Sequence, residues 1–152
     1  MRLFGSAERE IVILAYTALF LAEDAGILRI LASKGRAGVA VRIALGDPDG
    51  PNVADRGAEE GIGDAMAAKI RNALMPYRPL GAVQNIEIRL HRTVLYNSIY
   101  RADGQFLVNQ HTYGIPAAQA PVICLSNAGS GEMSVLYLDS FERVWASSSP
   151  LE

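Results

Sequence analysis

The sequence predicts an α/β fold: a mixed, mainly parallel sheet flanked by helices on both faces. Two apolar runs rich in β-branched residues, 8–16 and 38–46, have the composition of strands buried on both sides. Apolar residues at helical spacing over 21–35 lie between them, and this order is that of a βαβ unit with parallel strands. At 152 residues the chain is long enough for one domain and too short for two.

Turns and one short helix are expected around these elements. Gly35 can end the first helix, because glycine readily adopts the backbone conformation found at helix C-termini. The second strand runs into the turn-forming sequence GDP at 46–48. Segment 48–63 is polar and dotted with glycine, and Asn52 or Asp55 is the expected cap of a short helix within it.

An amphipathic helix over 63–77 and a half-buried strand over 85–91 follow. Asp64 is the expected N-cap of the helix, and Pro76 and Pro79 are expected to end it. The strand alternates apolar and polar residues, which is the pattern of a strand with one buried face. Its inward side chains are expected to be Ile86, Ile88 and Leu90, and its outward side chains Glu87, Arg89 and His91.

The last elements are a hairpin, a strand and a helix. Strands over 95–101 and 105–112 flank an Ala-Asp-Gly turn. The apolar run 120–126 predicts another strand and contains the single cysteine, Cys124, which is expected to be a buried thiol. Apolar residues three and four apart in 131–147 predict a closing helix.

The chain is expected to form one domain over 1–150, with 151–152 as the remnant of an expression tag. This domain is expected to be one piece of a larger protein. The apolar run 11–22 is short for a membrane span and follows charged residues, so we expect a cytoplasmic protein without a membrane partner. Two histidines and scattered acids lack the spacing of a metal site, and no metal or cofactor is expected.

Two segments resemble the phospholipase D superfamily. The sequence GVAVRIALGD at 38–47 is similar to a hydrophobic strand of that superfamily with an internal arginine. The hairpin LYNSIYRADGQFLVNQHTYG falls where the superfamily carries its HxKxxxxD motif and the following GSxN. With Asp103 aligned, Tyr96 takes the histidine position, Ser98 the lysine position, and 110–113 the GSxN position. The resemblance implies a phospholipase D-like half, one of two units that together build a cleft.

The replaced residues are those that carry the superfamily's chemistry, in which histidine acts as nucleophile and lysine binds the phosphate. The hydroxyl of Tyr96 is a poor nucleophile near neutral pH, because an unperturbed tyrosine has a pKa of about 10. Ser98 has no charge with which to hold a phosphodiester. A non-catalytic domain without catalytic residues is therefore expected. The alternative is a divergent phosphodiesterase or nuclease that uses His111 or His91.

Three segments also resemble a domain of uncharacterised function in actinobacterial proteins: LFGSAEREIVILAY, RGAEEGIGDAMAAKIRNAL and LYNSIYRADGQFLVNQHTYG. That domain often follows an N-terminal helix-turn-helix in transcription regulators, which implies a ligand-sensing or dimerisation domain. The net charge of −2 gives no basic excess, so DNA binding is expected only through a helix-turn-helix outside this sequence. A purely structural oligomerisation domain is a third interpretation.

Polar groups in the hairpin and beside it are the candidate contacts to a polar small molecule. Alternate residues of a strand share one face, so Tyr96, Ser98 and Tyr100 are expected to line up. Instead of contacting a ligand, His111 could be an ordinary hydrogen-bonded strand residue. Arg56 could likewise form only a local salt bridge at the start of a helix. Asp47 qualifies by position, because ligands bind where parallel strands end. The full set of expected contacts is Tyr96, Ser98, Tyr100, Asn109, His111, His91, Asp47 and Arg56.

A homodimer is expected from the same resemblance. In the superfamily the cleft is built from two motif-bearing halves, and this chain holds one such motif, at 96–103. Two identical chains related by a two-fold axis would supply both halves, with the hairpins near the axis. The same symmetry would suit a helix-turn-helix dimer that reads two related DNA half-sites.

Overall fold

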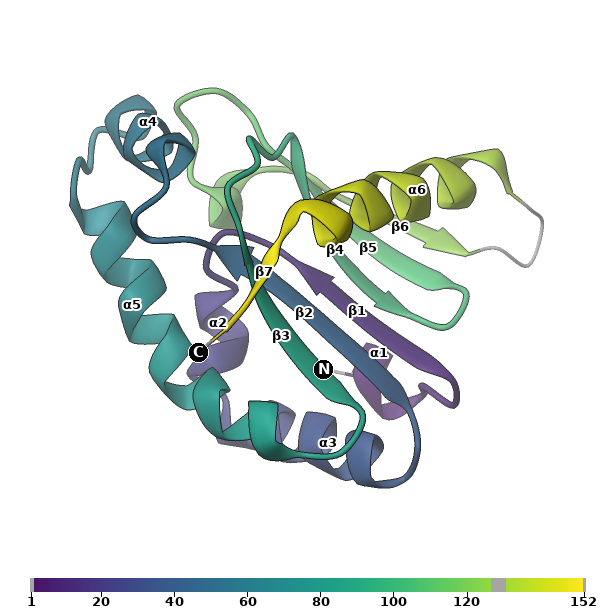
Figure 1. The fold of residues 1–152 in the computed structure, drawn as a ribbon. Helices are drawn as coiled ribbons and strands as arrows, with labels where there is room; N and C mark the ends of the chain where they lie inside the picture. The colour runs from purple at the N-terminus through teal and green to yellow at the C-terminus, as the bar shows by residue number, and fades with distance from the viewer. Residues whose placement is uncertain (1, 127–130, 152) are drawn as a thin grey trace.

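The structure is a computed structural model that describes residues 2–126 and 131–151. Seven strands form one open sheet in the order β6-β5-β4-β1-β2-β3-β7 (Figure 1). The strand bounds are Glu10–Leu14 for β1, Ala40–Gly46 for β2, Ile86–His91 for β3, Asn97–Ala102 for β4, Gln105–Gln110 for β5, Val122–Ser126 for β6 and Ser149–Pro150 for β7.

The mixed α/β class is confirmed, but the expectation of a mainly parallel sheet is wrong. Among the described strands, β1 pairs with β2 and β2 with β3 in parallel, as the βαβ pattern predicted. The other four pairings are antiparallel: β1 with β4, β4 with β5, β5 with β6, and β3 with β7. The connections from β3 to β4, from β4 to β5 and from β5 to β6 contain no α-helix, and without a helical crossover the chain reverses direction at each of them.

The helices agree with the predicted ones in place and differ in their ends. Asp24 divides the expected first helix in two, because its carboxylate accepts hydrogen bonds from the N–H groups of Gly26 and Ile27 and so starts a new helix. The bounds are Arg2–Gly5 for α1, Leu19–Ala22 for α2, Ala25–Arg36 for α3, Pro51–Glu59 for α4, Ala65–Tyr77 for α5 and Glu132–Ser147 for α6, with 3₁₀ turns at Arg78–Ala82 and Ala117–Gln119.

The caps expected for α4 and α5 are corrected. Gly50 occupies the N-cap position of α4 and a proline its first turn, so neither Asn52 nor Asp55 caps this helix. Asp64 does stand at the N-cap position of α5, but its side chain makes no capping hydrogen bond. Pro76 lies inside α5, which passes into the 3₁₀ turn after Tyr77.

Helices on both faces of the sheet are confirmed. α3 lies against the face that carries Ile86, where a Cβ added to Gly35 would stand 2.7 Å from the Ile86 Cγ1 atom. Val41, paired with Ile86, shares this face. The next residue, Arg42, faces α6 on the other side, and its guanidinium lies 4.9 Å from the centre of the Phe141 ring.

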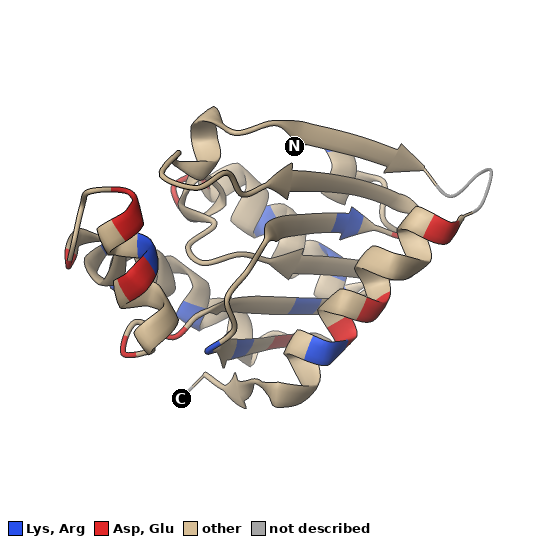
Figure 2. Ribbon diagram, turned by 90° about the horizontal axis from the view of Figure 1, so that it is seen from above, with Lys and Arg blue, Asp and Glu red and all other residues tan. Residues whose placement is uncertain are grey.

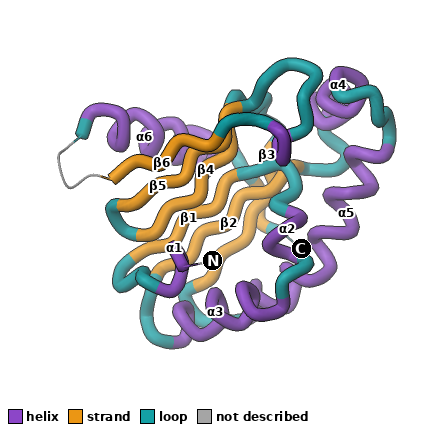
Figure 3. The backbone as a smooth tube through the Cα atoms, turned by 180° about the vertical axis from the view of Figure 1, so that it is seen from behind, coloured by secondary structure: helices purple, strands orange, loops and turns teal. Residues whose placement is uncertain are grey.

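Of the face that α3 covers, the half formed by β4, β5 and β6 is largely open, since α1 and α2 contact β4 and no described helix lies over β5 and β6 on this side (Figure 3). Tyr100, Leu107 and Cys124 are paired across these three strands and therefore share that face. The expectation that Cys124 is buried is wrong: it is exposed, because β6 is an edge strand on an uncovered part of the sheet. This open half provides the floor of the candidate site.

The hairpin between β4 and β5 is tied to the start of β1 by Asp103. Its two carboxylate oxygens accept hydrogen bonds from the backbone N–H groups of Glu8, Arg9 and Glu10 at 2.8–2.9 Å. Asp103 itself has a positive φ of 51°, a conformation that aspartate tolerates better than most residues. One side chain thus fixes the turn against a strand distant in sequence.

The end of the chain takes part in the sheet, which the sequence did not predict. β7 pairs with β3, and the Leu151 N–H donates a hydrogen bond to the Ile88 carbonyl at 3.0 Å. Leu151 was expected to lie outside the fold as part of a tag remnant. Glu152 falls outside the described residues.

Candidate functional site

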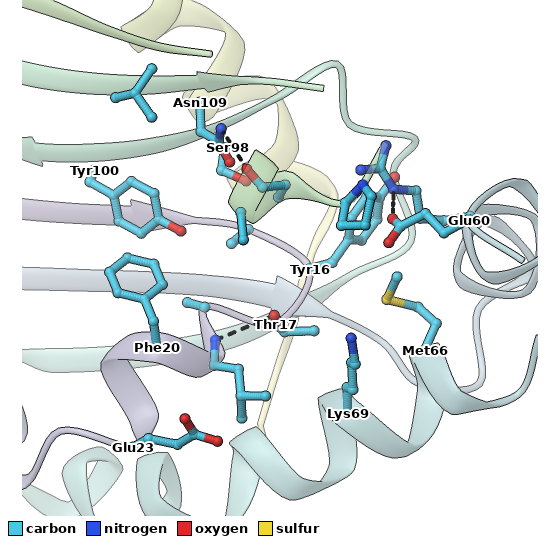
Figure 4. A pocket seen from close by; sticks show the side chains of 18 of the residues that line it. Tyr16, Thr17, Phe20, Glu23, Glu60, Met66, Lys69, Ser98, Tyr100 and Asn109 are labelled. Carbon is cyan, nitrogen blue, oxygen red and sulfur yellow. Dashed lines mark hydrogen bonds and ion pairs between the residues drawn. The ribbon is translucent and has the colours of Figure 1, made fainter. Parts of the chain in front are cut away.

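A pocket of about 560 Å³ lies over the open half of the sheet, beside the segment that follows β1 (Figure 4). Its floor comes from β4, β5 and β6, one wall from α2, another from α4 and α5, and its rim from the loop after β5. Residues from all of these elements line the pocket, among them Tyr16, Phe20, Arg56, Lys69, Ser98, Tyr100, Leu107, Asn109, Ala118 and Val122.

Ser98, Tyr100 and Asn109 are the predicted residues that meet on the pocket floor. Ser98 and Asn109 are directly opposite each other on β4 and β5, and all three are nearly buried. The Asn109 amide nitrogen donates to the Ala117 carbonyl at 3.1 Å, which leaves the amide oxygen without a partner among the described residues. Burial raises the pKa of the Tyr100 phenol, which therefore stays protonated at neutral pH. The floor therefore presents neutral polar groups.

Ser98 and His111 form a hydrogen-bonded pair behind the floor. The His111 Nδ1 lies 3.2 Å from the Leu95 carbonyl oxygen, which can only accept, so Nδ1 carries the proton. Nε2 is then the acceptor of the Ser98 hydroxyl proton at 2.9 Å. This chain of contacts fixes both the tautomer of His111 and the rotamer of Ser98.

The His111 ring is held neutral by its surroundings. Burial and, to a smaller extent, the positive charge of Arg56 lower the pKa of His111 to about 4, against the opposing effect of the hydrogen bond to the Leu95 carbonyl. At neutral pH the imidazole therefore accepts a hydrogen bond from Ser98 and carries no charge. His111 does not itself line the pocket, and it touches the pocket through its hydrogen bond with Ser98.

Tyr16, which sequence reasoning missed, organises this end of the site. Its ring stacks on His111 at 5.8 Å and 24°, and lies 5.8 Å from the ring of His91. Its hydroxyl accepts a hydrogen bond from the Leu95 N–H at 2.8 Å. The Arg56 guanidinium lies 5.9 Å from the centre of the same ring. Tyr16 belongs to the apolar run 8–16, and nothing in the sequence distinguished it from an ordinary core residue.

Arg56 is a pocket residue, and its ion pair is part of the wall. Its Nε donates to the Glu60 carboxylate one helical turn away, and its Nη2 donates to the Ile115 carbonyl at 3.3 Å. Both side chains are buried, with exposed fractions of 8% and 5%. Arg56 thus forms the local salt bridge that was one interpretation of it, and it also lines the pocket.

The rest of the lining is largely apolar, which the polar hairpin did not indicate. Phe20 meets Tyr100 edge-on at 5.5 Å (Figure 4). Leu107 and Val122 extend the floor toward β6. Lys69 on α5 points into the pocket, and no described residue forms an ion pair with it. The site thus joins an apolar slot to a polar end.

Three predicted contacts lie elsewhere. Tyr96 is 78% exposed and does not line the pocket. His91 is completely buried instead of outward-facing: its Nε2 donates to the Ala15 carbonyl at 3.0 Å, and its Nδ1 accepts the Thr93 N–H. Burial lowers its pKa, so it serves as a neutral link between β1 and β3.

Asp47 is the third of these residues, and it is engaged outside the pocket. Its carboxylate accepts hydrogen bonds from the Arg92 side chain and from the Asp49 N–H, both at 2.9 Å. The pocket lies at the carboxyl end of β1, whereas Asp47 follows β2. Asp47 and the pocket therefore lie at the carboxyl ends of two different strands.

The described residues include no cluster of three or more His, Cys, Asp or Glu side chains that could hold a metal ion. Among the same residues, no helix has the length and apolar content needed to cross a membrane.

Comparison with known proteins shows a likeness in fold. No protein-family model and no curated protein matches the sequence. A solved structure of TrmBL2, an archaeal chromatin protein, superposes on 99% of this chain with a TM-score of 0.57 and 15% sequence identity. The present chain spans about half of that protein, 48% of its length. At this identity the likeness establishes a shared fold.

Proposed function

We propose that this chain is a ligand-sensing and dimerisation domain of a transcription regulator, without catalytic activity of its own. The observation that carries the proposal is the pocket, in which hydrogen bonds hold Ser98 and Asn109 next to Tyr100 and beside a largely apolar slot. A concave site of 300–1,000 Å³ with a few fixed polar groups is the common form of a small-molecule site, and this pocket holds about 560 Å³.

The polar end selects for hydrogen-bond donors on the ligand. The Ser98 hydroxyl proton is committed to His111, so its oxygen is available to accept. The Asn109 amide nitrogen is committed to Ala117, so its oxygen is also available to accept. A ligand with hydroxyl or N–H groups at one end and an apolar body over Leu107 and Val122 would satisfy both parts of the site.

The regulator assignment draws on the fold likeness. TrmBL2 is described as a chromatin protein whose structure shows a novel mode of DNA binding, and about half of its length lies outside the likeness. By analogy, DNA would be bound by a helix-turn-helix outside the present sequence, since this domain has a net charge of −2. The domain would then report ligand binding to that DNA-binding part.

A phospholipase D-like half stays a prediction within this proposal. β4, the turn at Asp103 and β5 form a hairpin, as the alignment with the motif assumed. Tyr96, at the position of the lost nucleophile, is exposed and lies away from the pocket. The proposal is therefore a binding site on this scaffold without the superfamily's reaction.

A hydrolase is the second candidate, because Ser98 donates to His111 at 2.9 Å as a nucleophile donates to a general base. Two features oppose it. Burial and Arg56 hold the pKa of His111 at about 4, so the imidazolium that proton transfer would create is disfavoured. The Nδ1 of His111 donates to a neutral carbonyl, that of Leu95, so no carboxylate stabilises the imidazolium.

No hydrolysis of bis-p-nitrophenyl phosphate, phosphatidylcholine or p-nitrophenyl butyrate is expected above the buffer background. Absorbance or product analysis over hours at pH 7 measures this. Turnover that disappears in His111→Ala, in a variant with the melting temperature of the wild type, would replace the sensor assignment with the enzyme.

Ligand binding is tested by a thermal-shift screen of hydroxyl- and amine-bearing metabolites. A true ligand is expected to raise the melting temperature of the wild type, because it binds only the folded chain. Ala118→Trp fills the pocket rim from an exposed position and should abolish the shift. Ala68→Trp, also exposed but outside the pocket, should leave it unchanged. Shifts that Ala118→Trp leaves intact would place binding elsewhere.

A further inference from the structure

The two edges of the sheet differ in how they are protected. β7 is two residues long and ends in Pro150, which has no N–H to offer a further strand. β6 is five residues long, VICLS, with no proline and no charge, and Figure 2 shows it without a Lys, Arg, Asp or Glu along its length. An uncharged edge strand is the form that pairs with another strand.

The free hydrogen-bonding groups of β6 can be assigned. The Gln110 N–H donates to the Pro121 carbonyl, so in the alternating antiparallel pattern 121, 123 and 125 point their backbone groups at β5. The N–H and C=O groups of Val122 and Cys124 therefore point away from the sheet. Cys124 is the central residue of the strand.

Apolar side chains flank this edge. Val122 and Ile123 on β6 are 57% and 37% exposed. The first turns of α6 lie beside β6 (Figure 1) and expose further large apolar side chains. We call the combined set the β6–α6 surface, and it consists of Ile123, Met133, Val135 and Leu136 on the α6 side of this edge and Val122 on its pocket side, with exposed fractions of 37–65%.

We propose that the β6–α6 surface binds a second copy of this chain, with the two β6 strands paired antiparallel about Cys124. The strand is self-complementary in this register, because the outward N–H and C=O groups of Cys124 in one chain face the same groups of Cys124 in the other chain. Ile123 is then opposite the partner's Leu125, and the exposed residues of the two α6 helices meet on the same face. The inference rests on the proposed dimerisation role and gives it a location, at the sheet edge instead of the hairpin tip.

The area available is that of a small specific dimer. Five large side chains that are about half exposed, together with the outward backbone of β6, would bury on the order of 1,000 Å² across two copies, which is the lower bound for a specific interface. Val122 belongs both to this edge and to the pocket lining. Ligand occupancy and pairing therefore share one residue, as a sensor requires.

Light scattering at micromolar concentration tests the pairing, and about twice the 16.3 kDa chain mass is expected. A short bismaleimide should join two chains efficiently, and every such product links Cys124 to Cys124 because the chain has one cysteine. Leu136→Lys should yield monomers with unchanged melting temperature, since Leu136 is 65% exposed in one chain. Met75→Lys, on α5 and 70% exposed, is the matched control and should stay dimeric.

Cys124→Pro is a second variant that tests the strand itself. It removes an outward N–H and no hydrogen bond to β5, so it should give folded monomers. A dimer that resists both variants and does not cross-link would overturn the β6 location while leaving the dimerisation role intact. A monomer throughout would overturn the pairing and the dimerisation role together, and the thermal-shift screen would still decide ligand sensing.

Discussion

Asp103→Ala is expected to lower the free energy of unfolding by about 2–4 kcal/mol. The carboxylate receives three backbone N–H groups at 2.8–2.9 Å, and the substitution leaves all three donors without it. It also places an alanine at a positive φ, which costs more than aspartate does there. Chemical denaturation at pH 7 measures the change.

The matched control is Asp64→Ala. Asp64 stands at a helix N-cap but makes no capping hydrogen bond, so its removal should change stability by less than about 0.5 kcal/mol. Asp103→Asn keeps one acceptor oxygen and should lose less than the alanine variant. Equal stability of Asp103→Ala and the wild type would contradict the role given to this turn.

Asp103 also predicts a pH dependence. Burial tends to raise the pKa of its carboxyl, but the N–H donors of Glu8, Glu10 and Arg9 outweigh this effect and hold the pKa below its ordinary value. A lowered folded-state pKa gives stability that is present above the unfolded pKa, about 3.9, and lost as pH falls through the folded pKa. The alanine variant should lack this part of the acid dependence.

Arg56→Met is expected to destabilise the chain by about 3–5 kcal/mol, because it leaves the Glu60 carboxylate buried without its partner. It should also raise the pKa of His111 above about 4, since Arg56 is one of the two causes that lower it. An NMR titration of the imidazole protons measures this shift. The matched control is Arg71→Met, whose ion pair with Asp49 is exposed and should contribute less than about 1 kcal/mol.

The sign of the His111 contribution follows from its lowered pKa. Between the folded value of about 4 and an unfolded value of about 6.5, the unfolded chain binds the extra proton. Stability from this group is therefore complete above pH 6.5 and declines as pH falls toward 4. In Arg56→Met the folded and unfolded pKa values of His111 should lie closer together, so the loss of stability should extend over a narrower pH range. A His111 pKa that does not move in this variant would contradict the coupling described for the site.

The sequence predicted the α/β class and most elements, because hydrophobic periodicity reports burial within each segment. It did not predict strand direction around the hairpin, since the order of strands in a sheet depends on long-range pairing. His91 shows the same limit: alternation along β3 put it outward, but Tyr16 and the Ala15 carbonyl enclose it. Cys124 was expected to be buried because its run is apolar, although an edge strand can be apolar and exposed.

The site was half predictable for a similar reason. Ser98 and Asn109 could be found because a polar hairpin in an apolar sheet needs partners. Tyr16 and Phe20 could not, because they lie in an apolar run roughly 80–90 residues away in the sequence, and only the pairing of β1 with β4 brings them beside the floor. Arg56 was predicted as a site residue because its charge could bind an anionic ligand, and in the structure its ion-pair partner is Glu60.

Under the proposed function, the pocket over Ser98 and Asn109 binds a small molecule and leaves it intact. Native mass spectrometry of the chain, equilibrated with the compound that gives the largest thermal shift, tests it most directly. We expect one intact molecule per chain, released unchanged on denaturation, and no complex with Ala118→Trp. Recovery of a cleaved product, or an equal complex with Ala118→Trp, would contradict the claim.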